Sequence, residues 1–167
     1  MDRVKLLNYF RDEIGFEISF VKEAYLKKAF CVNYYELKTQ EGNEVNKQLS
    51  SCESKGNLPL ALVGEKVFQL FKVSDLYRLN MPISMYISDS KRGDDAYACK
   101  ICERLGLFDF AYVQVEDEIK TSFEGNDGTT KKAQVLFALI GAIYLTLEEN
   151  GQSFSELKKF MRKIENN

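Results

Sequence analysis

The sequence contains no histidine and no tryptophan among its 167 residues. The absence of histidine excludes mechanisms that rely on an imidazole base, a serine–histidine pair or a histidine-ligated metal. Phosphoryl chemistry that uses carboxylates and Mg²⁺ survives this exclusion, because hard cations take oxygen ligands. The side chains that could carry chemistry in this chain are therefore carboxylates and cysteines.

The four cysteines are Cys31, Cys52, Cys99 and Cys102, and the last two form a CxxC sequence. A redox CxxC usually follows a strand and begins a helix. This one lies in the middle of a helical pattern of apolar residues, so we interpret Cys99 and Cys102 as core residues. A zinc site completed by Cys31 and Cys52 is the alternative, although those two do not form a second CxxC.

Apolar periodicity predicts helices along the whole chain. The predicted helices cover residues 2–14, 20–31, 59–79, 83–90, 93–105 and 129–149, and a last amphipathic helix follows a capping box formed by Ser153 and Glu156. The segment "FAYVQVEDEIKTSFEGNDGTT" alternates briefly, but we expect an extended linker rather than half of a sheet. The predicted fold class is all-α, with residues 1–167 forming a single domain.

Composition supports a globular chain with a sizeable core, since 45% of the residues are apolar, including 12 Phe and 9 Tyr. The net charge of −2 gives no overall basic field, so nucleic-acid binding would require a local cluster of Lys and Arg. No apolar run approaches the roughly 18–20 residues that span a bilayer, and the amino terminus has no signal-peptide core. We therefore expect a protein of the cytoplasm, or another soluble intracellular compartment, with no membrane partner.

Four segments follow one another in a recognisable order: "IGFEISFVKEAYLKKAFCVNYY", "LPLALVGEKVFQLFKVSDLYRLN", "ACKICERLGLFDF" and "KKAQVLFALIGAIYL". They resemble, in turn, the opening helix, the signature helix, the Ala-rich helix and the last signature of the nuclease domain of the ribonuclease III family. The segment "ALIGAIYL" is the most specific part. The resemblance covers nearly the whole chain and implies a ribonuclease III-like helical endonuclease fold.

The resemblance also implies where catalytic acids should stand. Members of the family cleave double-stranded RNA with Mg²⁺ held by four carboxylates, two from each of two helices. Residues spaced i, i+4 or i, i+3 project from one helix face, so two such helices can build an oxygen cage. In this chain the four positions are Ala61, Glu65, Gln134 and Phe137. Only Glu65 is an acid, and it is one methylene longer than the family's aspartate.

One remaining carboxylate attracts Mg²⁺ too weakly for the ion to release its bound water. An apolar Phe137 cannot ligate a metal, and Gln134 offers only a neutral amide oxygen. We therefore expect neither hydrolysis nor a bound cofactor. The alternative is an active double-stranded-RNA endonuclease that holds Mg²⁺ or Mn²⁺ with Glu65 and non-standard acids. Candidates for such acids are Glu53, Glu124 and Asp127. The alternative is that these three residues are ordinary solvated surface residues.

Basic residues that could contact RNA phosphates are Lys131, Lys132, Lys91 and Arg92, with a further group on the last helix, Lys158, Lys159, Arg162 and Lys163. A charged outer helix face is more often simply solvated, so the RNA-binding prediction is weak. The chain ends at Asn167 soon after the last helix, and we expect no appended double-stranded-RNA-binding domain.

The resemblance further implies a two-fold dimer through the signature helix, where the family places an aromatic residue beside the first acid. Leu62 stands at that position and is still apolar. With Leu60, Val63 and Val67 it predicts a self-complementary surface. The alternative is that these residues are interior to one chain.

The sequence therefore predicts a catalytically inactive ribonuclease III-like protein that acts as a dimerisation or RNA-binding scaffold in RNA processing or a ribonucleoprotein. Its partner would be a second copy or a ribonuclease III-like relative, with structured or double-stranded RNA as a further ligand. A third hypothesis is a purely structural protein that no longer binds RNA.

Overall fold

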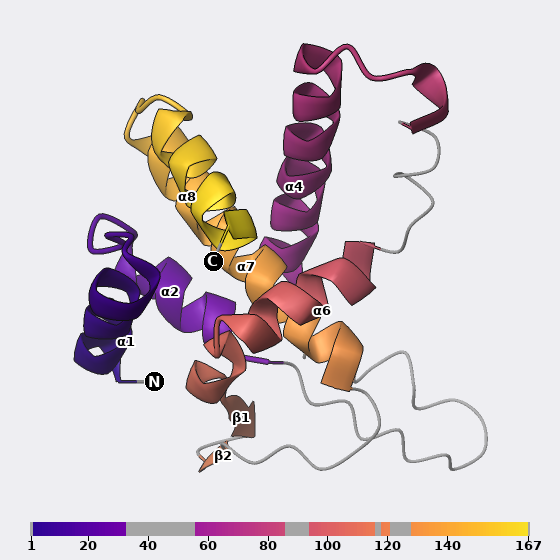
Figure 1. Ribbon diagram of the computed structural model, residues 1–167. Helices are drawn as coiled ribbons and strands as arrows, with labels where there is room; N and C mark the ends of the chain where they lie inside the picture. Colours follow the sequence, from indigo (N-terminus) through magenta and orange to yellow (C-terminus); the bar gives the residue numbers. More distant parts are fainter. Residues whose placement is uncertain (1, 33–55, 86–93, 116–117, 121–127, 167) are drawn as a thin grey trace, which may run out of the picture.

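The computed structural model describes residues 2–32, 56–85, 94–115, 118–120 and 128–166. Within these ranges the chain is mostly helical, as predicted (Figure 1). The helices are α1 (Arg3–Tyr9) with its π-helical continuation η1 (Phe10–Ile14), α2 (Glu23–Phe30), α4 (Leu58–Arg78), α6 (Asp94–Arg104), the 3-10 helix η2 (Leu107–Phe110), α7 (Gly128–Glu149) and α8 (Ser155–Asn166). Of the helix expected at 83–90, residues 83–85 are helical and the rest lies outside the described residues.

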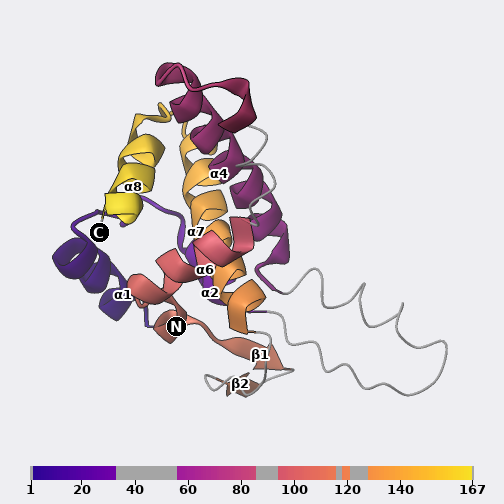
Figure 2. The ribbon, with the colours of Figure 1, turned by 45° about the vertical axis from the view of Figure 1, so that its right-hand side comes forward.

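Helix α7 is the centre of the core, and α4, α6, α2 and α8 pack around it (Figure 2). Every residue from Val135 to Ile143 is buried, which is why this helix is apolar on all sides. Among the described helices, α7 alone is long and apolar enough to cross a membrane, but 67% of its most apolar 18-residue stretch is buried inside the fold. A core helix of a soluble domain has the same properties.

Helices α4 and α7 cross at Gly64 and Gly141, where their backbones touch. A Cβ atom added to Gly64 would lie 1.7 Å from the carbonyl oxygen of Phe137, and one added to Gly141 would lie 2.2 Å from the carbonyl oxygen of Leu60. Only glycine leaves room for this approach. The crossing fixes how the first half of α4 sits on α7.

A small antiparallel hairpin follows η2, and here the expectation of an extended linker was wrong. Strand β1 (Val113–Val115) pairs with β2 (Glu118–Lys120), with Val113 opposite Lys120. Tyr112, just before β1, donates its N–H to the carbonyl of Phe30 at 2.9 Å and accepts from the N–H of Val32 at 2.8 Å. The strands are too short for their alternation to be distinctive, and the contact with the end of α2 joins residues far apart in the sequence.

The start of α8 uses only half of the predicted capping box. The Ser153 hydroxyl accepts a hydrogen bond from the N–H of Ser155 at 3.1 Å, as a capping serine does. The Glu156 carboxylate instead accepts from the Lys159 ammonium at 2.7 Å. Helix α8 then buries Leu157, Phe160, Met161 and Ile164 on its inner face.

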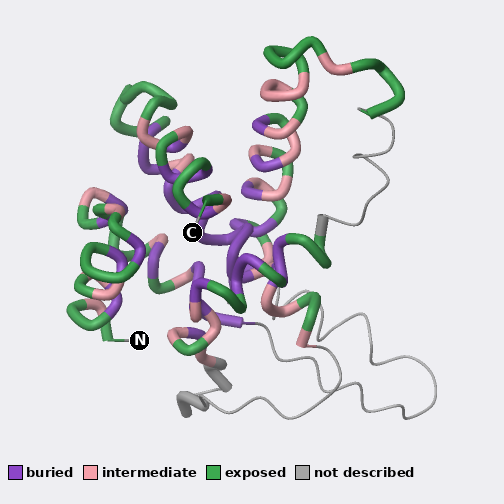
Figure 3. Tube along the Cα trace, viewed as in Figure 1, coloured by how far each residue is buried: buried purple, intermediate pink, exposed green. Residues whose placement is uncertain are grey.

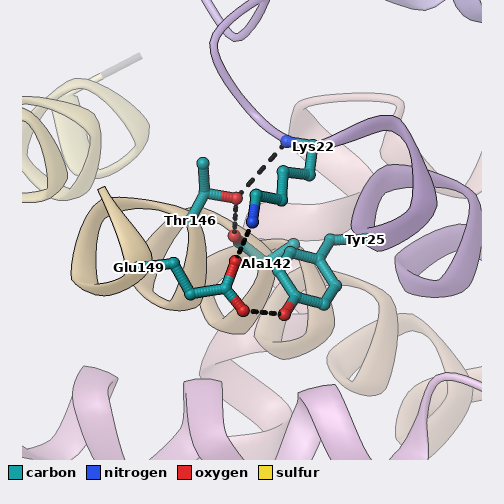
Figure 4. Close-up of polar contacts among 5 residues, drawn as sticks. All are labelled: Lys22, Tyr25, Ala142, Thr146 and Glu149. Atoms are coloured by element: carbon teal, nitrogen blue, oxygen red, sulfur yellow. Dashed lines mark hydrogen bonds and ion pairs between the residues drawn. The ribbon is translucent and has the colours of Figure 1, made fainter.

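A polar cluster ties the start of α2 to the end of α7 (Figure 4). The Glu149 carboxylate accepts hydrogen bonds from the Lys22 ammonium and the Tyr25 hydroxyl. The buried Thr146 hydroxyl accepts from the N–H of Lys22 at 3.3 Å and donates to the carbonyl of Ala142 at 2.8 Å. The cluster therefore satisfies backbone groups at the entry to α2 and holds that helix on α7.

The Glu149 cluster makes the stability of the fold depend on pH. The hydrogen bond from Lys22, followed by that from Tyr25, lowers the pKa of Glu149. A carboxyl group whose pKa is lower in the folded than in the unfolded protein stabilises the fold at pH values above its unfolded pKa of about 4.3. That stabilisation is lost as the pH falls through the folded pKa. We expect Glu149→Gln to lower the melting temperature slightly at pH 7, and the difference from the unmodified protein to shrink as the pH falls below about 4.3. Thermal unfolding across pH tests this, with Glu148→Gln as the control because Glu148 is an exposed neighbour outside the cluster.

Candidate functional site

The four positions that the sequence resemblance assigns to metal-binding acids lie on α4 and α7, close to the glycine crossing. Ala61 and Phe137 are buried, with Phe137 only 3% exposed, while Glu65 and Gln134 are partly exposed. Phe137 and Ala61 belong to the continuous hydrophobic core. Two of the four positions are thus interior packing positions in this protein.

Phe137 belongs to an aromatic cluster between α4, α6 and α7 that is centred on Phe68. Its ring meets that of Phe68 edge-on, with 5.6 Å between the ring centroids. The Phe68 ring in turn lies 6.1 Å from that of Tyr97, and the Lys72 ammonium lies 5.6 Å and 5.4 Å from these two ring centroids. Edge-on aromatic pairs contribute about 0.5–1.5 kcal/mol beyond their burial. An aromatic contact therefore occupies the position to which the sequence resemblance assigns a carboxylate.

Glu65 is held by side chains of its own helix. The Gln69 amide donates to Glu65 Oε1 at 3.0 Å, and the Lys66 ammonium lies 3.3 Å from the same oxygen. Within the described ranges, no group of three or more Cys, Asp or Glu side chains is arranged to hold a metal ion. The non-standard acids Glu53, Glu124 and Asp127 lie outside those ranges. Within the described ranges Glu65 is the one carboxylate at the four positions, and a single carboxylate offers Mg²⁺ little negative charge in exchange for its water.

Of the basic residues predicted to contact RNA, Lys131 and Lys132 lie in the described part of the chain, near the start of α7. The Lys132 ammonium binds the Glu103 carboxylate at 2.7 Å and lies 5.9 Å from the Phe108 ring centroid. The hydrogen bond that Lys132 donates to Glu103 raises the pKa of Lys132. Lys131 is partly buried on the same turn, and Lys91 and Arg92 lie outside the described residues. A phosphate that binds Lys132 would have to compete with Glu103.

Cys99 and Cys102 are buried on α6, which confirms their interpretation as core residues. Burial, followed by the proximity of Cys99, raises the pKa of Cys102 to about 12. Burial likewise raises the pKa of Cys99. Cys31 is buried at the end of α2, and Cys52 lies outside the described residues, so the zinc alternative stays untested.

These raised pKa values predict unreactive thiols, since only the thiolate attacks alkylating agents. At pH 8 we expect iodoacetamide to modify Cys99 and Cys102 at least about tenfold more slowly in the folded protein than in guanidinium chloride, where a thiol pKa is about 8.5. Peptide mapping by mass spectrometry measures each cysteine separately. Equal rates in both conditions would contradict the burial of these side chains.

The outer face of α4 carries apolar residues that nothing in the described part of the chain covers. Leu62, Leu70, Val73 and Tyr77, hereafter the α4 stripe, are 55%, 67%, 45% and 77% exposed. Their spacing of eight, three and four residues places them on one side of the helix. From Leu70 to the end of α4, Phe71 is the single buried residue (Figure 3). The sequence signal for this stripe was the apolar character of α4 on most sides.

The predicted dimer surface changes in one respect. Leu60 is only 4% exposed and packs at the crossing with Gly141, so it is interior to the chain and must be removed from that surface. Leu62 is exposed, and Val63 and Val67 are partly exposed. Leu62 therefore connects the predicted surface to the longer α4 stripe.

A groove lies between the second half of α4 and helix α8, hereafter the α4–α8 groove. Val67 and Phe71 line one wall, Leu157 and Met161 the other, and Tyr144 of α7 also contributes. The cavity measures about 290 Å³. Sequence reasoning missed it, because its lining comes from three separate helices.

Compared with models of known protein families, with curated protein sequences and with solved structures, the chain has no significant match.

Proposed function

We propose that this protein is a catalytically inactive ribonuclease III-like scaffold that dimerises through α4. The resemblance of the four quoted segments motivates the family. The observation that carries the loss of hydrolysis is the contact between Phe137 and Phe68, 5.6 Å between ring centroids, at a position where a metal-binding acid is needed. The exposed α4 stripe supports dimerisation, because contiguous exposed apolar surface marks interaction sites.

The α4 stripe suits a second copy of the same chain. The stripe runs from Leu62 to Tyr77, a length of about 22 Å at 1.5 Å per residue. If two α4 helices pair in antiparallel fashion about a two-fold axis near Leu70, Leu62 of one copy meets Tyr77 of the other. The pairing is thus complementary in apolar surface.

Light scattering after size exclusion tests the dimer. The chain mass is 19.2 kDa, so we expect the unmodified protein to elute with twice this mass. The double variant Leu62→Lys and Tyr77→Lys is expected to elute as a monomer. Val4→Lys is the matched control, because Val4 is 68% exposed on α1, away from the stripe, and its variant should remain a dimer. A monomer mass for the unmodified protein at high concentration would contradict self-association.

The RNA part of the proposal is tested with a perfect RNA duplex in the presence of Mg²⁺ or Mn²⁺. We expect no cleavage, and binding that weakens as salt rises, because phosphate contacts release counterions. Cleavage that Glu65→Gln abolishes would replace the scaffold with the active endonuclease. If there is neither cleavage nor salt-sensitive binding, a purely structural dimer is the function that survives.

A further inference from the structure

The α4–α8 groove is built from side chains whose positions are set by the core. Leu157 and Met161 of α8 are 5% and 0% exposed, so their side chains are fixed by packing. The ring of Tyr144 stacks on that of Phe154 at 5.4 Å between centroids and 20° between planes. Figure 2 shows α8 and α4 on either side of α7. The groove is a consequence of how three packed helices meet.

The size of the groove favours a small ligand. Its volume of about 290 Å³ lies at the lower end of the range of about 300–1,000 Å³ that ligand pockets occupy. A short alkyl chain or a single ring system fills such a space. A docked helix would need room for several large side chains in a row, so the volume argues against a helical partner.

The charges along the groove favour an anion. Lys158 of α8 and Arg78 of α4 are its two cationic lining residues, and Asp75 is its single carboxylate. Asp75 lies 3.6 Å from Arg78, whereas no carboxylate among the described residues pairs with Lys158. One net positive charge therefore remains beside an apolar cavity, in a chain whose overall charge is −2.

We propose that the α4–α8 groove binds a small amphipathic carboxylate. The apolar part of the ligand lies against Phe71, Leu157 and Tyr144, and the carboxylate accepts hydrogen bonds from Lys158 and from Arg78. Apolar lining with a few placed polar groups is the usual composition of ligand sites. This binding activity is separate from the proposed dimerisation, because Lys158 and Ser74 lie outside the α4 stripe.

Isothermal titration calorimetry with sodium decanoate tests the proposal on the full chain. We expect decanoate to bind and decyltrimethylammonium, which has the same chain and the opposite charge, to bind at least about tenfold more weakly, the equivalent of 1.4 kcal/mol. Lys158→Gln should weaken decanoate binding by about the same factor. Lys159→Gln is the matched control, because Lys159 is exposed on the same helix and bonded to Glu156, so its variant should bind decanoate normally.

A second variant tests the cavity rather than the charge. Ser74 lines the groove and is only partly exposed, so Ser74→Phe should fill the cavity without removing any core side chain and should abolish decanoate binding. Thermal unfolding checks that the variant is folded. Absence of decanoate binding, or binding that neither Lys158→Gln nor Ser74→Phe weakens, would overturn the proposal. If decanoate does not bind and Ser74→Phe converts a dimer to a monomer, the groove is a contact between copies instead.

Discussion

Gly64→Ala is expected to lower the free energy of unfolding by about 3 kcal/mol or more, at the upper end of the costs of overpacking. The new Cβ atom would lie 1.7 Å from the carbonyl oxygen of Phe137 and 2.7 Å from the backbone nitrogen of Gly141. These are backbone atoms in the middle of a helix, so they cannot rotate away, and α4 would have to move off α7. For a chain of this size the loss corresponds to a fall of roughly 6–12 °C in melting temperature.

Gly128→Ala is the matched control, because it makes the same chemical change in a helix that has room for it. The nearest atom to its added Cβ is the flexible Cε of Lys132, at 4.0 Å. We expect unchanged stability or a gain of up to about 1 kcal/mol from reduced entropy of the unfolded chain. Thermal and urea unfolding followed by circular dichroism compare the two. Equal stability of both variants would show that α4 and α7 do not touch at Gly64.

Phe137→Glu restores the acid that the family resemblance places at this position, and we expect it to destabilise the fold by about 4 kcal/mol or more. The side chain is 3% exposed and contacts the Phe68 ring, so the introduced carboxylate would be buried without a partner. Phe137→Leu, the control, keeps an apolar side chain and should cost about 1–2 kcal/mol. Both values come from urea unfolding at pH 7.

The same two variants test the metal site. We expect millimolar Mn²⁺ to leave the melting temperature of both unchanged, because a ligand stabilises only a state that binds it. A rise for Phe137→Glu that is absent for Phe137→Leu would show that the new carboxylate reaches Glu65 around a cation. That result would contradict the closed aromatic cluster and support the active endonuclease.

In α4 and α7, the residues that pack the two helices together differ from the positions that the resemblance assigns to metal binding. The glycines at the crossing and the apolar residues around them keep α4 and α7 together. The positions beside them carry Ala61, Gln134 and Phe137, which supply no negative charge. We propose that what remains useful is surface, namely the α4 stripe for a second copy and the α4–α8 groove for a small anion.

Local patterns in the sequence determined the helices. The helices predicted at 59–79 and 129–149 are found at Leu58–Arg78 and Gly128–Glu149. Their signals are helical periodicity, a proline near the helix start and a glycine after the end, and each of these lies within one segment of the sequence. That three of the four positions assigned by the resemblance carry no acid was likewise visible in the sequence.

Only the tertiary structure decided which apolar residues are covered. Leu60 and Leu62 have the same hydropathy and are two positions apart, yet one packs on Gly141 and the other is exposed. A helix that is apolar on most sides does not reveal which side meets α7, because that depends on where the backbones can approach. The α4–α8 groove was missed for the same physical reason, since contacts between segments distant in the chain make it, whereas the hairpin at Val113 was missed because its strands have only three residues each.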